Sequence, residues 1–338
     1  MPEIVQWGDI RDQYTDSLLL GNGASMAVHP QFGYGSLFDR AQEIGHITPA
    51  VAGIFDRFGV NDFELVLRRL WQASLVNQSL EIPHGRVEEA YEEVRTALIS
   101  TVRDIHVDYD DALPHLRLIY PFMTHFDTVI SLNYDLIVYW SAMLGNRERG
   151  SHFKDGFIGG TFTEDWESLR APYGRATGST LFFYPHGNLA LTRTDDRRES
   201  KIGAQDGGRL LDAILDRWEG GATIPLFVCE GTAAHKKKSI ESSSYLERVF
   251  REVVPALGDS ITIYGWSLSE QDQHIVDQIT RNPPQKVAIS VRGGSQAFAQ
   301  QAEEKMVRAG VNQVDFFDSE SLGCWNNPTE APGEARVI

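Results

Sequence analysis

The stretch LLLGNGAS (residues 18–25) joins a short apolar run to a turn with two closely spaced glycines. A buried strand that stops on such glycines is how nucleotide-binding α/β folds bring backbone N–H groups close to a phosphate. We therefore predict a phosphate-binding turn formed by Gly21, Asn22, Gly23, Ala24 and Ser25. A tight strand-to-helix turn that binds no ligand is the alternative interpretation of the same glycines.

Two further polar clusters also follow apolar runs. Asn133, Tyr134 and Asp135 come directly after the run at 129–132, and His186 with Gly187 follows the run at 181–185. In an open α/β sheet, ligands bind outside the carboxyl ends of the strands. We therefore expect the three clusters to converge on one crevice. Asn133 and Asp135 also suit the first residues of a helix, because Asn and Asp favour the N-cap, and this alternative is compatible with a catalytic role.

The order of apolar runs and helical patterns predicts the fold class. Leu211, Ile214, Leu215 and Trp218 follow the i, i+3, i+4, i+7 spacing of a helix, and similar patterns separate several runs typical of strands. Alternation of this kind predicts a Rossmann-like α/β fold with a six- or seven-stranded, mostly parallel sheet covered on both faces. The expected strands are residues 17–20, 127–132, 180–184, 223–229, 260–264, 286–291 and 313–317.

Two long segments between these strands have a different character. Residues 36–126 contain several apolar stripes at helical spacing, such as Phe63, Val66, Leu67 and Leu70, and no strand pattern. We predict a helical insertion subdomain there, placed as a lobe at the carboxyl edge of the sheet. Residues 145–179 are rich in glycine and scattered charge, and we predict a long functional or mobile loop.

Composition excludes several classes of protein. The chain has 338 residues, 42% of them hydrophobic, and a formal net charge of −16. Such a charge opposes binding to nucleic acid and to anionic membranes. The two cysteines, Cys229 and Cys324, form no metal motif, and the histidines lack i, i+4 pairing, so we expect no metal. Because no apolar stretch is long enough to span a bilayer and the first residues lack a targeting pattern, we expect a cytoplasmic protein.

The polar clusters together resemble the motifs of sirtuins. The turn at 21–25 is similar to the sirtuin Gly-Ala-Gly-x-Ser turn, residues 133–135 to the Asn-x-Asp at a strand end, and 185–187 to the His-Gly pair that carries the catalytic histidine. Residues 264–269, YGWSLS, resemble the Gly-x-Ser-Leu segment that contacts the cofactor. The likeness covers about residues 15–318 and is nearest to divergent bacterial sirtuin-like proteins, several of which consume NAD in anti-phage defence. It implies a single sirtuin-like NAD-binding domain over 1–338, with Gly265, Ser267, Leu268 and Asp135 among the cofactor-binding residues.

The chain also departs from the protein-deacylating sirtuins. Those enzymes hold a structural zinc with two Cys-x-x-Cys pairs, and this sequence has no such pair. The arginine-bearing loop that follows their glycine turn is missing as well, because residues 26–30 read MAVHP. Since the zinc module helps to present an acyl-lysine peptide, deacylation is disfavoured and the NAD pocket is the shared part.

Cleavage of NAD needs groups that Asn133 and His186 can supply. The nicotinamide–ribose bond breaks through an oxocarbenium-like state, so an enzyme must hold the ribose, shield the cation and supply a nucleophile. Asn133 can hydrogen-bond a ribose hydroxyl and a water. His186, whose type has an unperturbed pKa near 6.5, can take a proton at neutral pH. Asp135 could anchor the loop or place negative charge near the cation. We therefore predict an NAD glycohydrolase that releases nicotinamide and ADP-ribose.

Other functions and other roles stay open at this stage. A non-catalytic sensor of NAD or an ADP-ribose derivative, transfer of ADP-ribose or an acyl group to a protein, and, more weakly, a dehydrogenase are the alternatives. Ser267, Ser269 and Asp272 could simply begin a helix, and the lysines at 236–238 read as a solvated charge run. Because unregulated NAD hydrolysis is toxic, we expect control by a protein partner or by homo-oligomers formed through the helical insertion.

Overall fold

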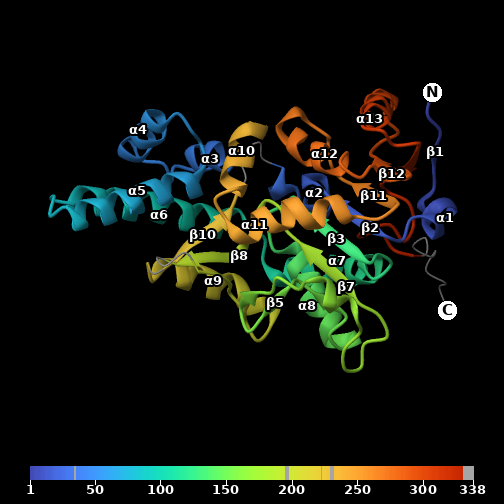
Figure 1. Cartoon of the computed structure of the whole chain (residues 1–338), viewed down its shortest axis with the longest axis horizontal. Helices are drawn as coiled ribbons and strands as arrows, with labels where there is room; N and C mark the ends of the chain where they lie inside the picture. The colour runs from blue at the N-terminus through green and yellow to red at the C-terminus, as the bar shows by residue number, and fades with distance from the viewer. Residues whose placement is uncertain (34–35, 195–197, 222, 229–231, 330–338) are drawn as a thin grey trace, which may run out of the picture.

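The computed structural model describes residues 1–33, 36–194, 198–221, 223–228 and 232–329 (Figure 1). Its main sheet has eight strands in the described part of the chain, and every neighbouring pair is parallel. An α/β fold with a mostly parallel sheet is thus confirmed, although the sheet is larger than predicted. From edge to edge the strands are β1 (Ile4–Val5), β13 (Gln313–Asp318), β12 (Lys286–Val291), β11 (Ser260–Tyr264), β2 (Ser17–Leu20), β3 (Thr128–Ser131), β7 (Thr180–Phe183) and β4 (Phe153–Lys154).

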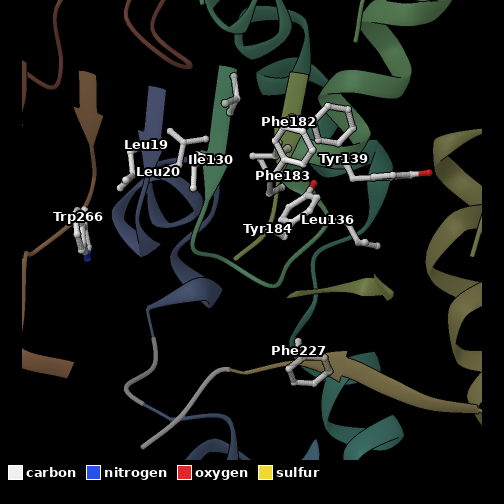
Figure 2. Close-up of a cluster of buried hydrophobic side chains, with 14 of the residues drawn as sticks. Leu19, Leu20, Ile130, Leu136, Tyr139, Phe182, Phe183, Tyr184, Phe227 and Trp266 are labelled. Atoms are coloured by element: carbon white, nitrogen blue, oxygen red, sulfur yellow. The ribbon is translucent and has the colours of Figure 1, made fainter. Parts of the chain in front are cut away.

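The central strands are buried on both faces. All four residues of β2 and all four of β3 are buried, as expected for parallel strands covered by helices on either side. Figure 2 shows Leu19 and Leu20 of β2 beside Ile130 of β3, with Phe182 and Phe183 of β7 further along. Continuous apolar runs are therefore what places these strands at the centre of the sheet.

The order of the strands creates a switch point beside β2. From β2 the chain proceeds outward on one side through β3 and β7, and it later fills the other side with β11, β12 and β13. Leu20, the last residue of β2, lies between Tyr264 of β11 and Ser131 of β3. The carboxyl ends of these three strands thus meet where an open α/β sheet binds its ligands.

One expected strand belongs to a different sheet. Residues 223–227 form β10 (Thr223–Phe227), which pairs antiparallel with β8 (Gly187–Thr194), and β8 pairs antiparallel with β9 (Glu199–Lys201). The expectation that this strand joins the main sheet is wrong, because β8 begins directly after His186 and offers β10 a nearer partner. Cys229, which follows β10, lies outside the described residues.

The predicted loop at 145–179 contains more regular structure than expected. Helix α8 (Ile137–Arg149) extends into it, and β4, a small hairpin of β5 (Phe157–Ile158) and β6 (Thr161–Phe162), and the 3₁₀ turn η3 (Glu167–Arg170) follow. These strands are only two residues long, too short for a recognisable alternation. The prediction of one long loop over residues 145–179 is therefore wrong where these elements occur.

Between β2 and β3 the chain forms a succession of helices. They are α2 (Asn22–Val28), η2 (Pro30–Phe32), α3 (Leu37–Glu43), α4 (Pro49–Phe58), α5 (Phe63–Ser79), α6 (Gly85–Ile105) and α7 (Tyr109–Met123). Helices α5 and α6 pack against each other and project away from the main sheet (Figure 1). Helix α5 contacts β10, and α6 contacts α9 (Leu210–Glu219), so this helical segment rests on the small antiparallel sheet.

The remaining helices flank the sheets and complete the single hydrophobic core. They are α1 (Trp7–Ile10), η1 (Arg11–Gln13), η4 (Gly207–Arg209), α10 (Ala233–Ile240), α11 (Ser244–Arg248), the π-helical η5 (Val249–Val253), η6 (Val254–Ala256), η7 (Glu270–Asp272), α12 (Gln273–Ile279) and α13 (Gln296–Arg308). Within the described ranges, none of the helices has the length and apolar character needed to cross a membrane.

Candidate functional site

A cavity of about 910 Å³ opens at the carboxyl ends of β2, β3 and β11. Its volume lies within the range of small-molecule sites. The four sequence segments expected to bind a nucleotide all contribute to its wall. The expected site residues that line it are Gly21, Asn22, Gly23, Asn133, Asp135, His186, Gly265 and Ser267. Ala24, Ser25 and Leu268 do not line it, and Ala24 and Ser25 are buried.

In the turn at residues 21–25, Gly21 and Gly23 allow the backbone to pack closely against the end of β11. The N–H of Gly21 donates to the Tyr264 carbonyl at 3.0 Å, and that of Gly23 donates to the Gly265 carbonyl at 2.7 Å. A Cβ on Gly21 would lie 2.5 Å from the Cα of Trp266, and one on Gly23 would lie 2.8 Å from the Cα of Gly265. The expected reason for these glycines therefore needs correction, because their N–H groups and missing side chains serve the contact with β11 rather than a phosphate.

One backbone donor of the turn remains available to a ligand. The N–H of Asn22 makes no hydrogen bond to any residue that the structure describes, and Asn22 lines the cavity. Its side-chain amide is held elsewhere, because Nδ2 donates to the Phe32 carbonyl at 3.0 Å. The turn thus offers one free backbone N–H where the sequence suggested several.

The amide nitrogen of Asn133 serves the fold, and its amide oxygen is available in the cavity. Its Nδ2 donates to the Gly21 carbonyl and to Ser25 Oγ, both at 2.9 Å. Both amide hydrogens are thereby used, so the donor that we expected to face a ligand is not available. Oδ1 remains as an acceptor for a hydroxyl group in the cavity.

Asp135 ties the glycine turn to the start of α8. Its Oδ2 accepts from Ser25 Oγ at 2.5 Å and its Oδ1 accepts from the Ile137 N–H at 2.9 Å. Burial raises the pKa of this carboxyl, while the Ser25 hydrogen bond and nearby His106 act in the opposite direction. The helix-capping interpretation thus describes the contacts of Asp135, which lines the cavity but uses both carboxylate oxygens to anchor the loop.

His186 lies on the connection between β7 and β8 and is only 2% exposed. Gly187 after it has φ +76°, and a Cβ there would lie 2.2 Å from the Leu226 carbonyl oxygen, so the turn into β8 requires glycine. Burial, reinforced by Lys236, lowers the pKa of His186 to about 3. The ring is therefore neutral at pH 7, and it is a weaker base than the unperturbed histidine assumed from the sequence.

Sequence reasoning missed the charged network around His186. Lys236 Nζ lies 2.8 Å from Asp272 Oδ1, and Trp266 Nε1 donates to Asp272 Oδ2 at 3.1 Å. Burial disfavours the Asp272 carboxylate, yet His186, Lys236 and these hydrogen bonds together lower its pKa to about 2. Lys236 is buried, so the prediction of a solvated lysine run is wrong at this position. No local pattern could reveal the pair, because its members lie 36 residues apart and meet only in the fold.

His186, Asp272 and His274 form a group whose ligand-type atoms all lie within 4.8 Å of one another. The expectation of no metal considered only the cysteines and the spacing of the histidines along the sequence, and it overlooked this meeting of distant segments. The ammonium of Lys236 already supplies the positive charge beside the carboxylate. We therefore assign no metal to this group and describe it as an ion-paired network.

A family model described as a domain of unknown function, DUF4917, matches residues 18–325, and the chain belongs to this family. The match extends from β2 through the segment that follows β13, so it includes every strand whose end borders the cavity. No curated protein matches the sequence.

Proposed function

We propose that this protein binds NAD in the cavity beside β2 and hydrolyses it to nicotinamide and ADP-ribose. The observation that carries the proposal is the placement of Asn133 and His186 in the wall of one cavity with the β2–α2 turn. The identity of the substrate comes from the resemblance of these segments to sirtuin-like proteins.

The free polar atoms of the cavity suit the parts of an NAD molecule. Asn133 Oδ1 can accept a hydrogen bond from a ribose hydroxyl, which orients the sugar. The N–H of Asn22 and the guanidinium of Arg292, which also lines the cavity, can donate to the pyrophosphate. Arg292 forms no ion pair with the described residues. In a chain with a net charge of −16, a cation facing the cavity favours an anionic ligand.

His186 supplies the acid–base step. As the bond from C1′ to the nicotinamide nitrogen breaks, its electron pair leaves with nicotinamide, and a water oxygen forms the new bond to C1′. The neutral His186 ring takes the proton that this water loses. Such proton transfer contributes roughly 10²–10⁴-fold to a rate, so its removal should affect turnover far more than binding.

The direct test is to incubate the full chain with NAD and to quantify free nicotinamide and ADP-ribose. We expect the natural protein to release both in equal amounts and the His186→Ala variant to release neither. Saturating NAD should still raise the melting temperature of His186→Ala, because ligand binding to the folded state is retained. Full turnover by a folded His186→Ala variant would remove the catalytic assignment.

A sensor of NAD or of an ADP-ribose derivative is the second candidate. The nearly complete burial of His186 and the engagement of the Asn133 donor favour it, since both residues contribute to the internal network. A sensor would be stabilised by NAD without releasing nicotinamide. Either activity would fit a role in anti-phage defence, which the resemblance to divergent bacterial sirtuin-like proteins implies, with control by a partner or by self-association.

A further inference from the structure

A second histidine contacts His186 inside the protein. Nε2 of His186 lies 2.9 Å from Nε2 of His274, and the two rings are stacked with centroids 5.0 Å apart. His274 is on α12, is 4% exposed and does not line the cavity. It therefore reaches a substrate only through His186.

The number of protons on the two rings decides how they bond. A neutral imidazole carries one N–H, so two neutral rings carry two protons. Three acceptors surround the pair, namely the carbonyl of Leu132 beside His186, the carbonyl of Gln271 beside His274, and the facing Nε2 atom. One of the three acceptors therefore receives no hydrogen bond. Nδ1 of His274 is indeed buried without a partner in good hydrogen-bond geometry. One added proton would allow all three bonds.

The charges around the pair allow one added proton and oppose a second. Asp272 of η7 and Asp277 of α12 favour a positive charge on the rings, whereas Lys236 of α10 and burial oppose it. On the remaining side, His274 packs against the apolar ring of Phe250. Two charged rings 2.9 Å apart would repel each other strongly in this low-dielectric interior.

We propose that His186 and His274 act as one base that takes up a single proton, with His274 as the positioning residue. The inference rests on the proposed function and adds a residue to it. In the reaction, an O–H bond of the attacking water breaks and an N–H bond forms at Nδ1 of His186, because Nε2 of that ring faces His274. The electron pair left on oxygen makes the bond to C1′. Both rings then share the proton that lies between their Nε2 atoms.

Two substitutions of His274 separate its hydrogen bond to His186 from its ability to share a proton with that ring. His274→Phe keeps a ring and removes the hydrogen bond, whereas His274→Gln can accept from the Nε2–H of His186 through Oε1 but cannot share its proton. We expect His274→Phe to lower kcat for nicotinamide release by at least about tenfold, with KM unchanged. His274→Gln should recover part of that loss. The acid limb of the kcat/KM profile should move to lower pH in His274→Phe, because a lone His186 is less basic.

His152→Phe is the matched control, since it also removes a buried histidine. His152 Nε2 contacts Thr180 Oγ1 at 3.1 Å and does not line the cavity. We expect its kcat and pH profile to equal those of the natural protein at a temperature where both are folded. An equal loss of kcat in His152→Phe and His274→Phe would show that any buried histidine matters, and would overturn the proposal.

A measurement without NAD distinguishes failure of this inference from failure of the proposed function. The ring ¹⁵N shifts of the histidine-labelled full chain, assigned with the single variants, report where each ring gains a proton. We expect His186 and His274 to titrate together, and His186 to titrate at lower pH in His274→Phe. If this coupling is seen and no nicotinamide is released, the hydrolase proposal fails while the pair stands. An unchanged His186 titration in His274→Phe, or stoichiometric zinc lost from that variant, overturns the pair.

Discussion

At the scale of single residues, the site depends on side chains that serve the fold and the cavity at once. Asn133 is the clearest case, because its two amide hydrogens hold Gly21 and Ser25 while Oδ1 remains for a ligand. Loss of this side chain therefore removes two buried hydrogen bonds of the fold and also removes an acceptor for the ligand. A matched variant that disturbs the hydrogen bonds but keeps the acceptor can separate these two effects.

We expect Asn133→Ala to abolish nicotinamide release and to lower the free energy of unfolding by about 1–3 kcal/mol, because buried hydrogen-bond partners lose their donor. Ser25→Ala is the matched variant, since Ser25 belongs to the same network and does not line the cavity. It should lose comparable stability and keep most of its kcat. Steady-state kinetics and urea unfolding measure the two effects. If Ser25→Ala loses activity as completely as Asn133→Ala, the amide oxygen has no separate role.

At the scale of secondary-structure elements, the site is assembled by the contact between the β2–α2 turn and the end of β11. The contact is reciprocal, because Gly265 has φ +66° and a Cβ on it would lie 2.3 Å from the Ala24 nitrogen. Glycines 21, 23 and 265 thus allow two strand ends to approach each other more closely than side chains permit. The cavity takes its shape from this approach.

Alanine at position 23 tests this contact. We expect Gly23→Ala to lower the free energy of unfolding by roughly 1–3 kcal/mol, as overpacking of a close contact does, and to weaken the stabilisation by NAD. Gly53→Ala is the control, because Gly53 lies in α4 and a Cβ there meets no atom within 4 Å. It should raise the stability by up to about 1 kcal/mol, as Ala is the better helix former. Thermal unfolding with and without NAD measures both, and an unaffected Gly23→Ala would contradict the packing argument.

The sequence was informative where an element carries its own signal. The runs at 17–20, 260–264 and 286–291 are continuous and apolar, and they form strands with the predicted bounds. The edge strands β1 and β4 are two residues long and have no pattern to detect. The run at 223–227 is as apolar as a central strand, yet its antiparallel partner is decided by the position of β8 after His186.

The same distinction applies to the residues of the candidate site: some carry a signal in the sequence, and others meet only through packing. Residues at the strand ends follow apolar runs, so Gly21, Asn133 and His186 can be singled out from the sequence. Lys236 comes from α10, whereas Asp272 and His274 come from the continuous segment η7–α12, and only packing around His186 brings these two segments together. The burial of Lys236 reverses what a run of lysines ordinarily indicates.

At the scale of the whole molecule, the projecting α5–α6 helices are where the expected self-association can be tested. Four exposed apolar side chains gather near the loop that joins these helices, with 38–64% of their surface accessible: Leu75, Val76, Leu80 and Ile82. We expect the paired change Val76→Glu with Leu80→Glu to shift the protein toward the monomer in sedimentation velocity experiments. A natural protein that sediments as a monomer at every concentration, with and without NAD, would end the proposal of control by self-association.

The stability of the whole molecule should also depend on the buried histidines. Burial lowers the pKa of His274 to about 4, whereas an unfolded histidine titrates near 6.5. Between these values the unfolded chain binds more protons than the folded one, so the stabilising contribution of neutral His274 is full above pH 6.5 and is lost as the pH falls toward 4. The slope from one such group is at most about 1.4 kcal/mol per pH unit. Burial acts on His186 in the same direction.

Melting temperatures measured between pH 8 and pH 4.5 test this dependence. We expect the natural protein to lose stability steeply below pH 6.5 and the His274→Gln variant to show a flatter profile over the same interval. His235→Gln, at an exposed position of α10, should follow the natural protein. Because the comparison concerns slopes, a constant loss of stability in His274→Gln leaves it interpretable. Parallel profiles for the natural protein and His274→Gln would mean that His274 binds its proton equally well in the folded and unfolded chains, contrary to its burial beside His186 and Lys236.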